Sequence, residues 1–280
     1  RALAPRAVAA QAMAPTPQEV LGAFEGRAAL GPEALKALEV VDASPQQLRT
    51  FQPRALARAA LAAASATPVR AKVLQEVSRA VAGAGEEQLK EFEASDLTTL
   101  AWAFAAADHC DEEAVAALTV LGKQVKERAW EFSGDELAKT VRAFAELRVQ
   151  HQGMLTTVTM ETMWKIDQFS SGGLARMAEA LVLLDFCKEP TFEWMAARVI
   201  GRLSDYKPDE LATVCWAFAA GGLRHEVFAD SVAGEIAKQG CKMSAEDFAR
   251  ASWALARLGT TARGATQPFY SPTLGVGDYS

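Results

Sequence analysis

The sequence predicts an all-α fold, a right-handed α-solenoid of two-helix hairpin repeats of about 37–41 residues with extended terminal tails. Two observations predict this class. Strand-like alternation bounded by turn dipeptides is nowhere evident, and a pattern of an aromatic residue or Met, four mixed residues and then Leu or Phe recurs six times. The copies are FQPRAL, FEASDL, FSGDEL, FSSGGL, YKPDEL and MSAEDF. They end at Leu56, Leu97, Leu137, Leu174, Leu211 and Phe248, in steps of 41, 40, 37, 37 and 37 residues.

We call the last residue of each copy, Leu or Phe, the anchor. The residues that follow it predict the first helix of each repeat. Six residues on, every copy has alanine, namely Ala62, Ala103, Ala143, Ala180, Ala217 and Ala254. One residue further, the copies have Ala63, Phe104, Phe144, Leu181, Phe218 and Leu255, which continue one apolar helical stripe. The alanine predicts close approach of a neighbouring helix, and the larger residue fills the space between layers.

The starts of these helices carry capping signals. Ser133 with Glu136, and Ser244 with Asp247, have the spacing of an N-cap and a reaching carboxylate. Pro53 also stands where a first-turn proline is tolerated. We therefore interpret the acidic residues that gather there as helix-capping groups that complement the helix dipole, rather than as catalytic groups.

A second helical stretch lies between successive anchors, so each repeat is expected to be a helical hairpin. These stretches are AVAALTVLGKQVKERAW, MLTTVTMETMWKI, TFEWMAARVIGRL and VFADSVAGEIAKQG. Breaks at 107–111, 150–153, 188–190 and 221–222 separate them from the first helices.

The chain is expected to divide into four parts. Residues 1–19 form an extended N-terminal segment that resembles the edge of a transit peptide, because it has two arginines and no acid before Glu19. Residues 20–91 form N-terminal helices with a degenerate capping repeat, 92–259 the helical-hairpin repeats, and 260–280 an extended C-terminal tail. The tail is rich in Gly, Pro, Ser and Thr, and we expect its aromatic residues to dock on a partner. These are Phe269, Tyr270 and Tyr279.

At the motifs TLAWAFAAAD, TVCWAFAAGG and RASWALARLG, the chain resembles the octotricopeptide-type helical repeats of organellar proteins, which also occur upstream of RAP domains. The resemblance covers about 92–259, and the tail after Gly259 is too short for a RAP domain. It implies a location in a chloroplast or mitochondrion and, often, binding of single-stranded RNA along a concave face.

Charge argues against RNA as the main partner. The whole chain has a net charge of −6, and residues 92–259 contain 17 Lys and Arg against 25 Asp and Glu, a net of −8. Repeats that follow a phosphate backbone need an excess of Lys and Arg. RNA binding is therefore disfavoured although still possible. No apolar run approaches the roughly 18 residues of a membrane span, which predicts a soluble or peripheral protein and leaves a membrane-bound complex open.

One position of the repeat is the candidate partner-binding or RNA-binding row. Five residues past the anchor, off the apolar stripe, the copies from the second onward have Trp102, Arg142, Glu179, Trp216 and Trp253, and the first has Leu61. One interpretation is a ladder of aromatic and Arg anchors that faces a partner. The other is packing between repeats, with Arg142 and Glu179 paired between stacked helices.

No residue pattern predicts catalysis, a metal site or a cofactor. His109, His151 and His225 stand without a partner at a known ligand spacing, and His109 lies in an acidic stretch that we interpret as a solvated turn. The leading hypothesis is a non-catalytic scaffold or peripheral subunit of a large organellar complex that binds other protein subunits. The alternative is an organellar RNA-binding factor.

Overall fold

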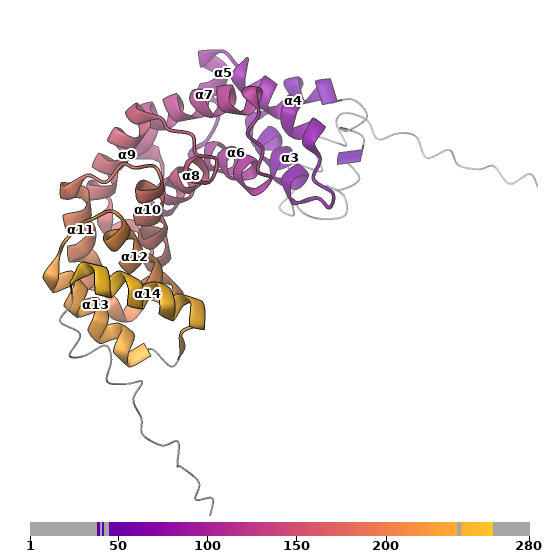
Figure 1. Ribbon diagram of the computed structural model, residues 1–280. Helices are drawn as coiled ribbons and strands as arrows, with labels where there is room; N and C mark the ends of the chain where they lie inside the picture. The colour runs from indigo at the N-terminus through magenta and orange to yellow at the C-terminus, as the bar shows by residue number, and fades with distance from the viewer. Residues whose placement is uncertain (1–37, 40, 42–44, 240–241, 260–280) are drawn as a thin grey trace, which may run out of the picture.

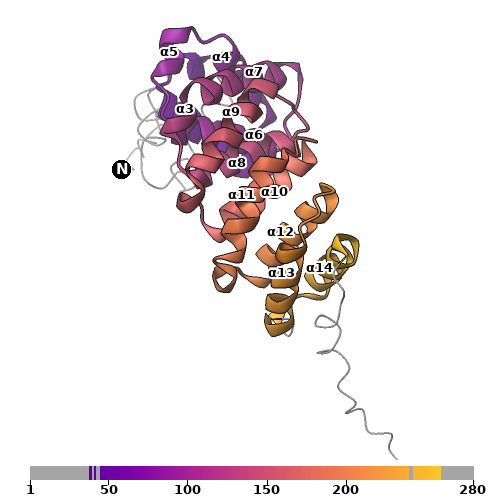
Figure 2. The same ribbon diagram turned by 90° about the vertical axis from the view of Figure 1, so that its left-hand side faces the viewer.

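The computed structural model describes residues 38–39, 41, 45–239 and 242–259. The segment expected at 1–19 and the tail expected at 260–280, with Phe269, Tyr270 and Tyr279, lie outside these residues. Helices and short connecting turns make up the described part, in which no β-strand occurs. Figure 1 shows the helices as two rows that follow an arch, and Figure 2 shows the same rows from the side.

The inner row contains the first helix of each repeat. Its members are α3 (Pro53–Ser65), α6 (Ala94–Ala106), α8 (Gly134–Glu146), α10 (Ser171–Leu183), α12 (Pro208–Ala220) and α14 (Ala245–Leu258). Each packs on the next along the row. The alanine and the larger residue that the sequence places six and seven residues past the anchor are buried in every copy. The predicted helical solenoid is therefore confirmed, while its handedness stays a prediction.

The outer row contains the second helix of each repeat, again packed in chain order. Its members are α4 (Ala71–Ala82), α7 (Glu112–Arg128), α9 (Gln152–Trp164), α11 (Glu189–Ile200) and α13 (Glu226–Gln239). Short helices precede the inner helices: η1 (Pro45–Thr50), α5 (Glu86–Lys90), η2 (Ala129–Glu131), η3 (Ile166–Gln168) and η4 (Leu203–Asp205). None of the described helices is both long and apolar enough to cross a bilayer.

Hydrogen bonds between successive repeats recur at one repeat position, at or just after the ends of α7, α9, α11 and α13. The donor side chain stands four residues before the aromatic residue or Met that begins the motif of its own repeat. It reaches the backbone carbonyl of the aromatic residue that begins the preceding motif. The pairs are Arg128 Nη2 to Phe92 O at 2.9 Å, Lys165 Nζ to Phe132 O at 2.8 Å, Arg202 Nη1 to Phe169 O at 3.3 Å and Gln239 Nε2 to Tyr206 O at 3.4 Å. This ladder adds polar specificity to a stack held mainly by apolar packing.

Candidate functional site

The predicted row lies on the solvent-facing side of the inner helices. Trp102, Arg142 and Trp216 are half-buried, and Trp253 is exposed. Glu179 is the least accessible member, with 9 % of its surface exposed. Each successive inner helix from α6 to α14 thus contributes one residue to the row.

Glu179 joins three inner helices through a shared carboxylate. Its Oε2 accepts a short hydrogen bond from Arg142 Nη1 of α8, and its Oε1 accepts another from Arg250 Nη2 of α14. The expected Arg142–Glu179 pair is therefore present. Arg250 was not expected, because it lies 71 residues away and reaches past α12 to make this contact. Charged hydrogen bonds in a partly dehydrated site are among the stronger polar contacts of a protein.

The three tryptophans of the row lie beside cations of neighbouring or the same helices. Lys139 Nζ is 5.3 Å from the ring centroid of Trp102, and Arg250 Cζ is 4.7 Å from that of Trp216. Arg257 Cζ is 5.6 Å from the Trp253 ring, and its Nε donates to the carbonyl of Ala219 at 2.9 Å. Burial also lowers the pKa of Lys139. These cations already contact groups of the protein itself, which reduces their availability to phosphates.

Two histidines that stand alone in the sequence are helix N-caps. Nδ1 of His151 accepts the backbone N–H of Met154 at 3.0 Å, and Nδ1 of His225 accepts that of Phe228 at 3.0 Å. Asp111 has the same role at the start of α7. Asp111, His151 and His225 occupy one repeat position, so the repeat register was the signal that could have identified these caps.

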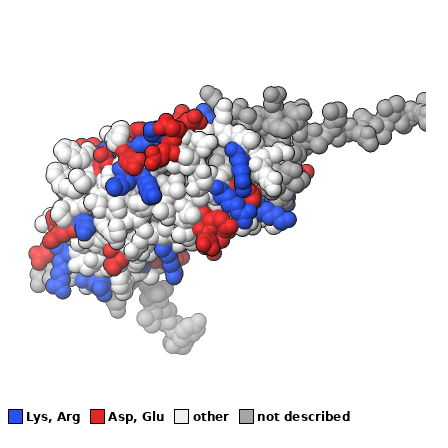
Figure 3. All heavy atoms as spheres, turned by 90° about the horizontal axis from the view of Figure 1, so that it is seen from above, with Lys and Arg blue, Asp and Glu red and all other residues white. Residues whose placement is uncertain are grey.

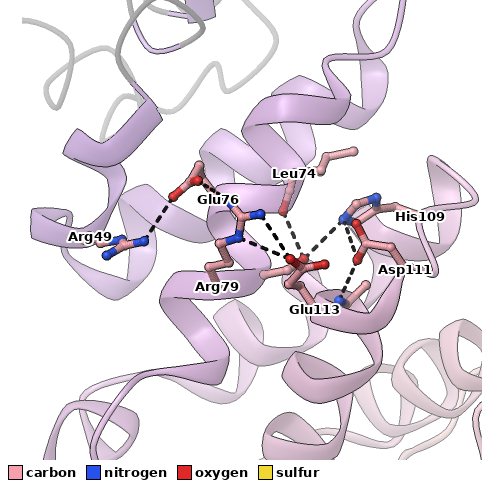
Figure 4. Close-up of polar contacts among 9 residues, drawn as sticks. Arg49, Leu74, Glu76, Arg79, His109, Asp111 and Glu113 are labelled. Atoms are coloured by element: carbon pink, nitrogen blue, oxygen red, sulfur yellow. Dashed lines mark hydrogen bonds and ion pairs between the residues drawn. The ribbon is translucent and has the colours of Figure 1, made fainter.

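His109 belongs to a polar network between α4 and α7, shown in Figure 4. Its Nε2 lies 3.2 Å from Ser78 Oγ and 3.7 Å from Asp111 Oδ1. Arg79 of the same network contacts Glu76 at 2.6 Å and Glu113 at 3.1 Å. Contrary to the expected solvated turn, the side chain of His109 points inward, and burial lowers its pKa. The network joins two outer helices.

The described residues contain no group of three or more His, Cys, Asp or Glu side chains placed to hold a metal. Figure 3 shows the surface seen from above, where Lys and Arg alternate with Asp and Glu and leave wide uncharged areas. This face has no continuous basic track of the kind that follows a phosphate backbone.

A model of the family described as RNA-editing substrate-binding complex 6 protein matches residues 77–263. The matched span covers more than half of the chain and includes the inner helices α6 to α14. The chain belongs to this family. No curated protein matches the chain.

Membership of the RNA-editing substrate-binding complex 6 protein family corrects the resemblance to octotricopeptide-type repeats, which was wrong. The motifs behind that resemblance combine an aromatic residue with alanines, as in TLAWAFAAAD. In the structure Ala101, Ala103 and Phe104 are core residues between stacked helices, a requirement that unrelated α-solenoids share. The expectation of a chloroplast location depended on the same resemblance and has no support.

Proposed function

We propose that the chain is a non-catalytic helical-repeat subunit of an RNA-editing substrate-binding complex in the mitochondrion, where it holds other protein subunits in place. The family description supports membership of such a complex. The observation that carries the scaffold role concerns the arginines of the inner helices. Arg142 and Arg250 are bound to Glu179, and Arg142 also to Glu146, so these two cations are already paired within the chain and are less available to RNA.

The test is to isolate the complex at native abundance through a tag on this chain, with and without ribonuclease treatment. We expect the same protein subunits to co-purify in the same ratio after ribonuclease, because the contacts are between proteins. Loss of those subunits on ribonuclease treatment would contradict the scaffold role. A chain that elutes alone under both conditions would contradict membership of a complex.

A second candidate function is binding of single-stranded RNA along the inner row, and the three tryptophans there favour it. Bases stack on aromatic side chains, at roughly 1–3 kcal/mol per base. The test is binding of the purified chain to a uridine-rich oligonucleotide at several salt concentrations, with Trp102→Ala and Trp216→Ala as variants and Trp164→Ala, on the outer row, as control. Steeply salt-dependent binding that only the inner variants weaken would support this function, and no measurable binding would exclude it for this RNA.

A further inference from the structure

A hollow of about 660 Å³ lies on the outer surface between α5, α7 and η2. Leu89 and Val120 give it an apolar lining, and Trp130 forms part of its wall. The Trp130 side chain is 64 % exposed, although a tryptophan of a stable monomer normally covers most of its surface. Figure 1 shows α5 at the outer edge of the arch beside α7, away from the inner row.

One side chain that lines the hollow has an unsatisfied polar atom. Gln124 of α7 is only 7 % exposed, and its Oε1 has no hydrogen-bond partner among the described residues. An unpaired buried acceptor is destabilising. The oxygen has almost no accessible surface, so a donor in the hollow would reach it only after the Gln124 side chain turned outward.

The charges around the hollow favour a cationic occupant. Lys90 Nζ is paired with Glu87 at 2.7 Å, and Arg128 donates to the carbonyl of Phe92 at 2.9 Å and is also paired with Glu131. Glu86, Glu127 and Lys123 also line the hollow, and no ion pair joins them to another described residue. Glu86 and Glu127 also attract Lys90 at longer range, but neither carboxylate has a direct partner among the described residues. A phosphodiester would approach these two carboxylates, whereas a guanidinium would pair with them.

We propose that this hollow binds a segment of another protein subunit in which an arginine stands next to a large apolar residue. The apolar side chain packs against Leu89 and Val120, and the guanidinium lies over Trp130 and pairs with Glu127. Arginine fits better than lysine because its planar group can stack on an indole and still donate to a carboxylate. The inference rests on the proposed role as a scaffold and names the chemistry of one partner contact.

The first experiment maps the occupant in the intact complex. A photo-reactive benzoylphenylalanine replaces Trp130, which preserves an aromatic wall, and the same substitution at Trp164 is the control. Trp164 is 81 % exposed but does not line this hollow. We expect adducts at position 130, several-fold above the control, with one protein peptide that contains an arginine beside an apolar residue. An RNA adduct, a peptide without arginine, or equal yields at both positions would overturn the proposal.

The second experiment measures the contact with a synthetic peptide of the cross-linked sequence and the purified full-length chain. Glu127→Lys and Trp130→Ala are each expected to weaken binding roughly tenfold, the equivalent of about 1.4 kcal/mol, with Trp164→Ala unchanged. A peptide carrying Glu in place of the arginine should regain affinity for the Glu127→Lys chain. Equal affinity for all variants would refute the site. If the variants bind the peptide as the parent does and the complex still assembles, only the proposed binding site in the hollow is contradicted. If the parent chain joins no complex, the proposed function is contradicted.

Discussion

Lys165 uses all three ammonium protons on carbonyl groups of the preceding repeat. Its Nζ lies 3.1 Å from Ala129 O, 2.8 Å from Trp130 O and 2.8 Å from Phe132 O. These carbonyls belong to η2 and the residue that follows it, so the lysine satisfies a helix end that would otherwise need water. In the sequence Lys165 resembles an ordinary surface cation, but in the structure its three hydrogen bonds hold it between two successive repeats.

Replacing Lys165 with methionine keeps the aliphatic part and removes the three hydrogen bonds. We expect the free energy of unfolding to fall by about 1–3 kcal/mol, since three carbonyls, two of them in partly buried contacts, lose a charged donor. Chemical denaturation followed by circular dichroism measures the change. Lys123→Met is the control, because Lys123 is exposed and makes no ion pair with a described residue, and it should stay within about 0.5 kcal/mol of the parent. Equal losses in both variants would show that Lys165 is not a special donor.

His109 should make the stability of the protein depend on pH. Burial lowers its pKa below the ordinary value of 6.5, an effect larger than the opposing influence of Asp111 and Glu113. The unfolded chain therefore takes up the proton at a higher pH than the folded chain does. The stabilising contribution is complete above about pH 6.5 and is lost as the pH falls through that value toward the folded pKa.

Denaturation midpoints of the parent chain and of His109→Gln, measured from pH 7.5 to 5.5, test this. Glutamine retains a polar group near Ser78 without titrating in this range. We expect the parent to lose more stability than the variant on acidification. Parallel pH profiles would be evidence against a destabilising proton on His109.

At the scale of helices, glycine allows close approach of α7 and α9. A Cβ atom at Gly122 would lie 2.6 Å from Cδ2 of the His151 ring, which is held in place because it caps α9. A Cβ atom at Gly234 of α13 would meet none of the surrounding atoms within 4 Å. The two glycines thus have the same effect on helix propensity but differ in packing.

Gly122→Ala should therefore destabilise the protein by about 1–3 kcal/mol, because overpacking exceeds the gain in helix propensity. Gly234→Ala should stabilise it by roughly 0.5–1 kcal/mol, because only the propensity changes. Thermal unfolding of the parent and the two variants measures whether each substitution stabilises or destabilises the protein. Stabilisation by Gly122→Ala would mean that His151 moves aside without cost.

At the scale of the whole molecule, the contact between Arg250 and Glu179 is unusual for a repeat protein. Solenoid repeats generally contact only their neighbours, and stability is then close to a sum of neighbouring terms. Here α14 also contacts α10, past the intervening α12. We expect this second-neighbour contact to help maintain the curvature of the arch.

Glu179→Gln should loosen this part of the arch. We expect a loss of roughly 1–3 kcal/mol, as two arginines lose a charged acceptor, and a larger maximum dimension by small-angle X-ray scattering. Glu146→Gln is the matched control, since Glu146 pairs with Arg142 along the same helix at 2.8 Å and should contribute only about 0.3–0.5 kcal/mol. An unchanged scattering profile for Glu179→Gln would show that apolar packing alone sets the curvature.

The sequence by itself determined the repeat register, the inner helices, the buried alanines and the caps at Ser133 and Ser244, because these depend on local periodicity and on contacts between adjacent repeats. It also located the row from Trp102 to Trp253 and the Arg142–Glu179 pair. Only the tertiary structure decided that Arg250 forms an ion pair with Glu179 and that Trp130 borders a hollow. Those features depend on how small rotations between repeats accumulate along the arch, which no local pattern of residues records.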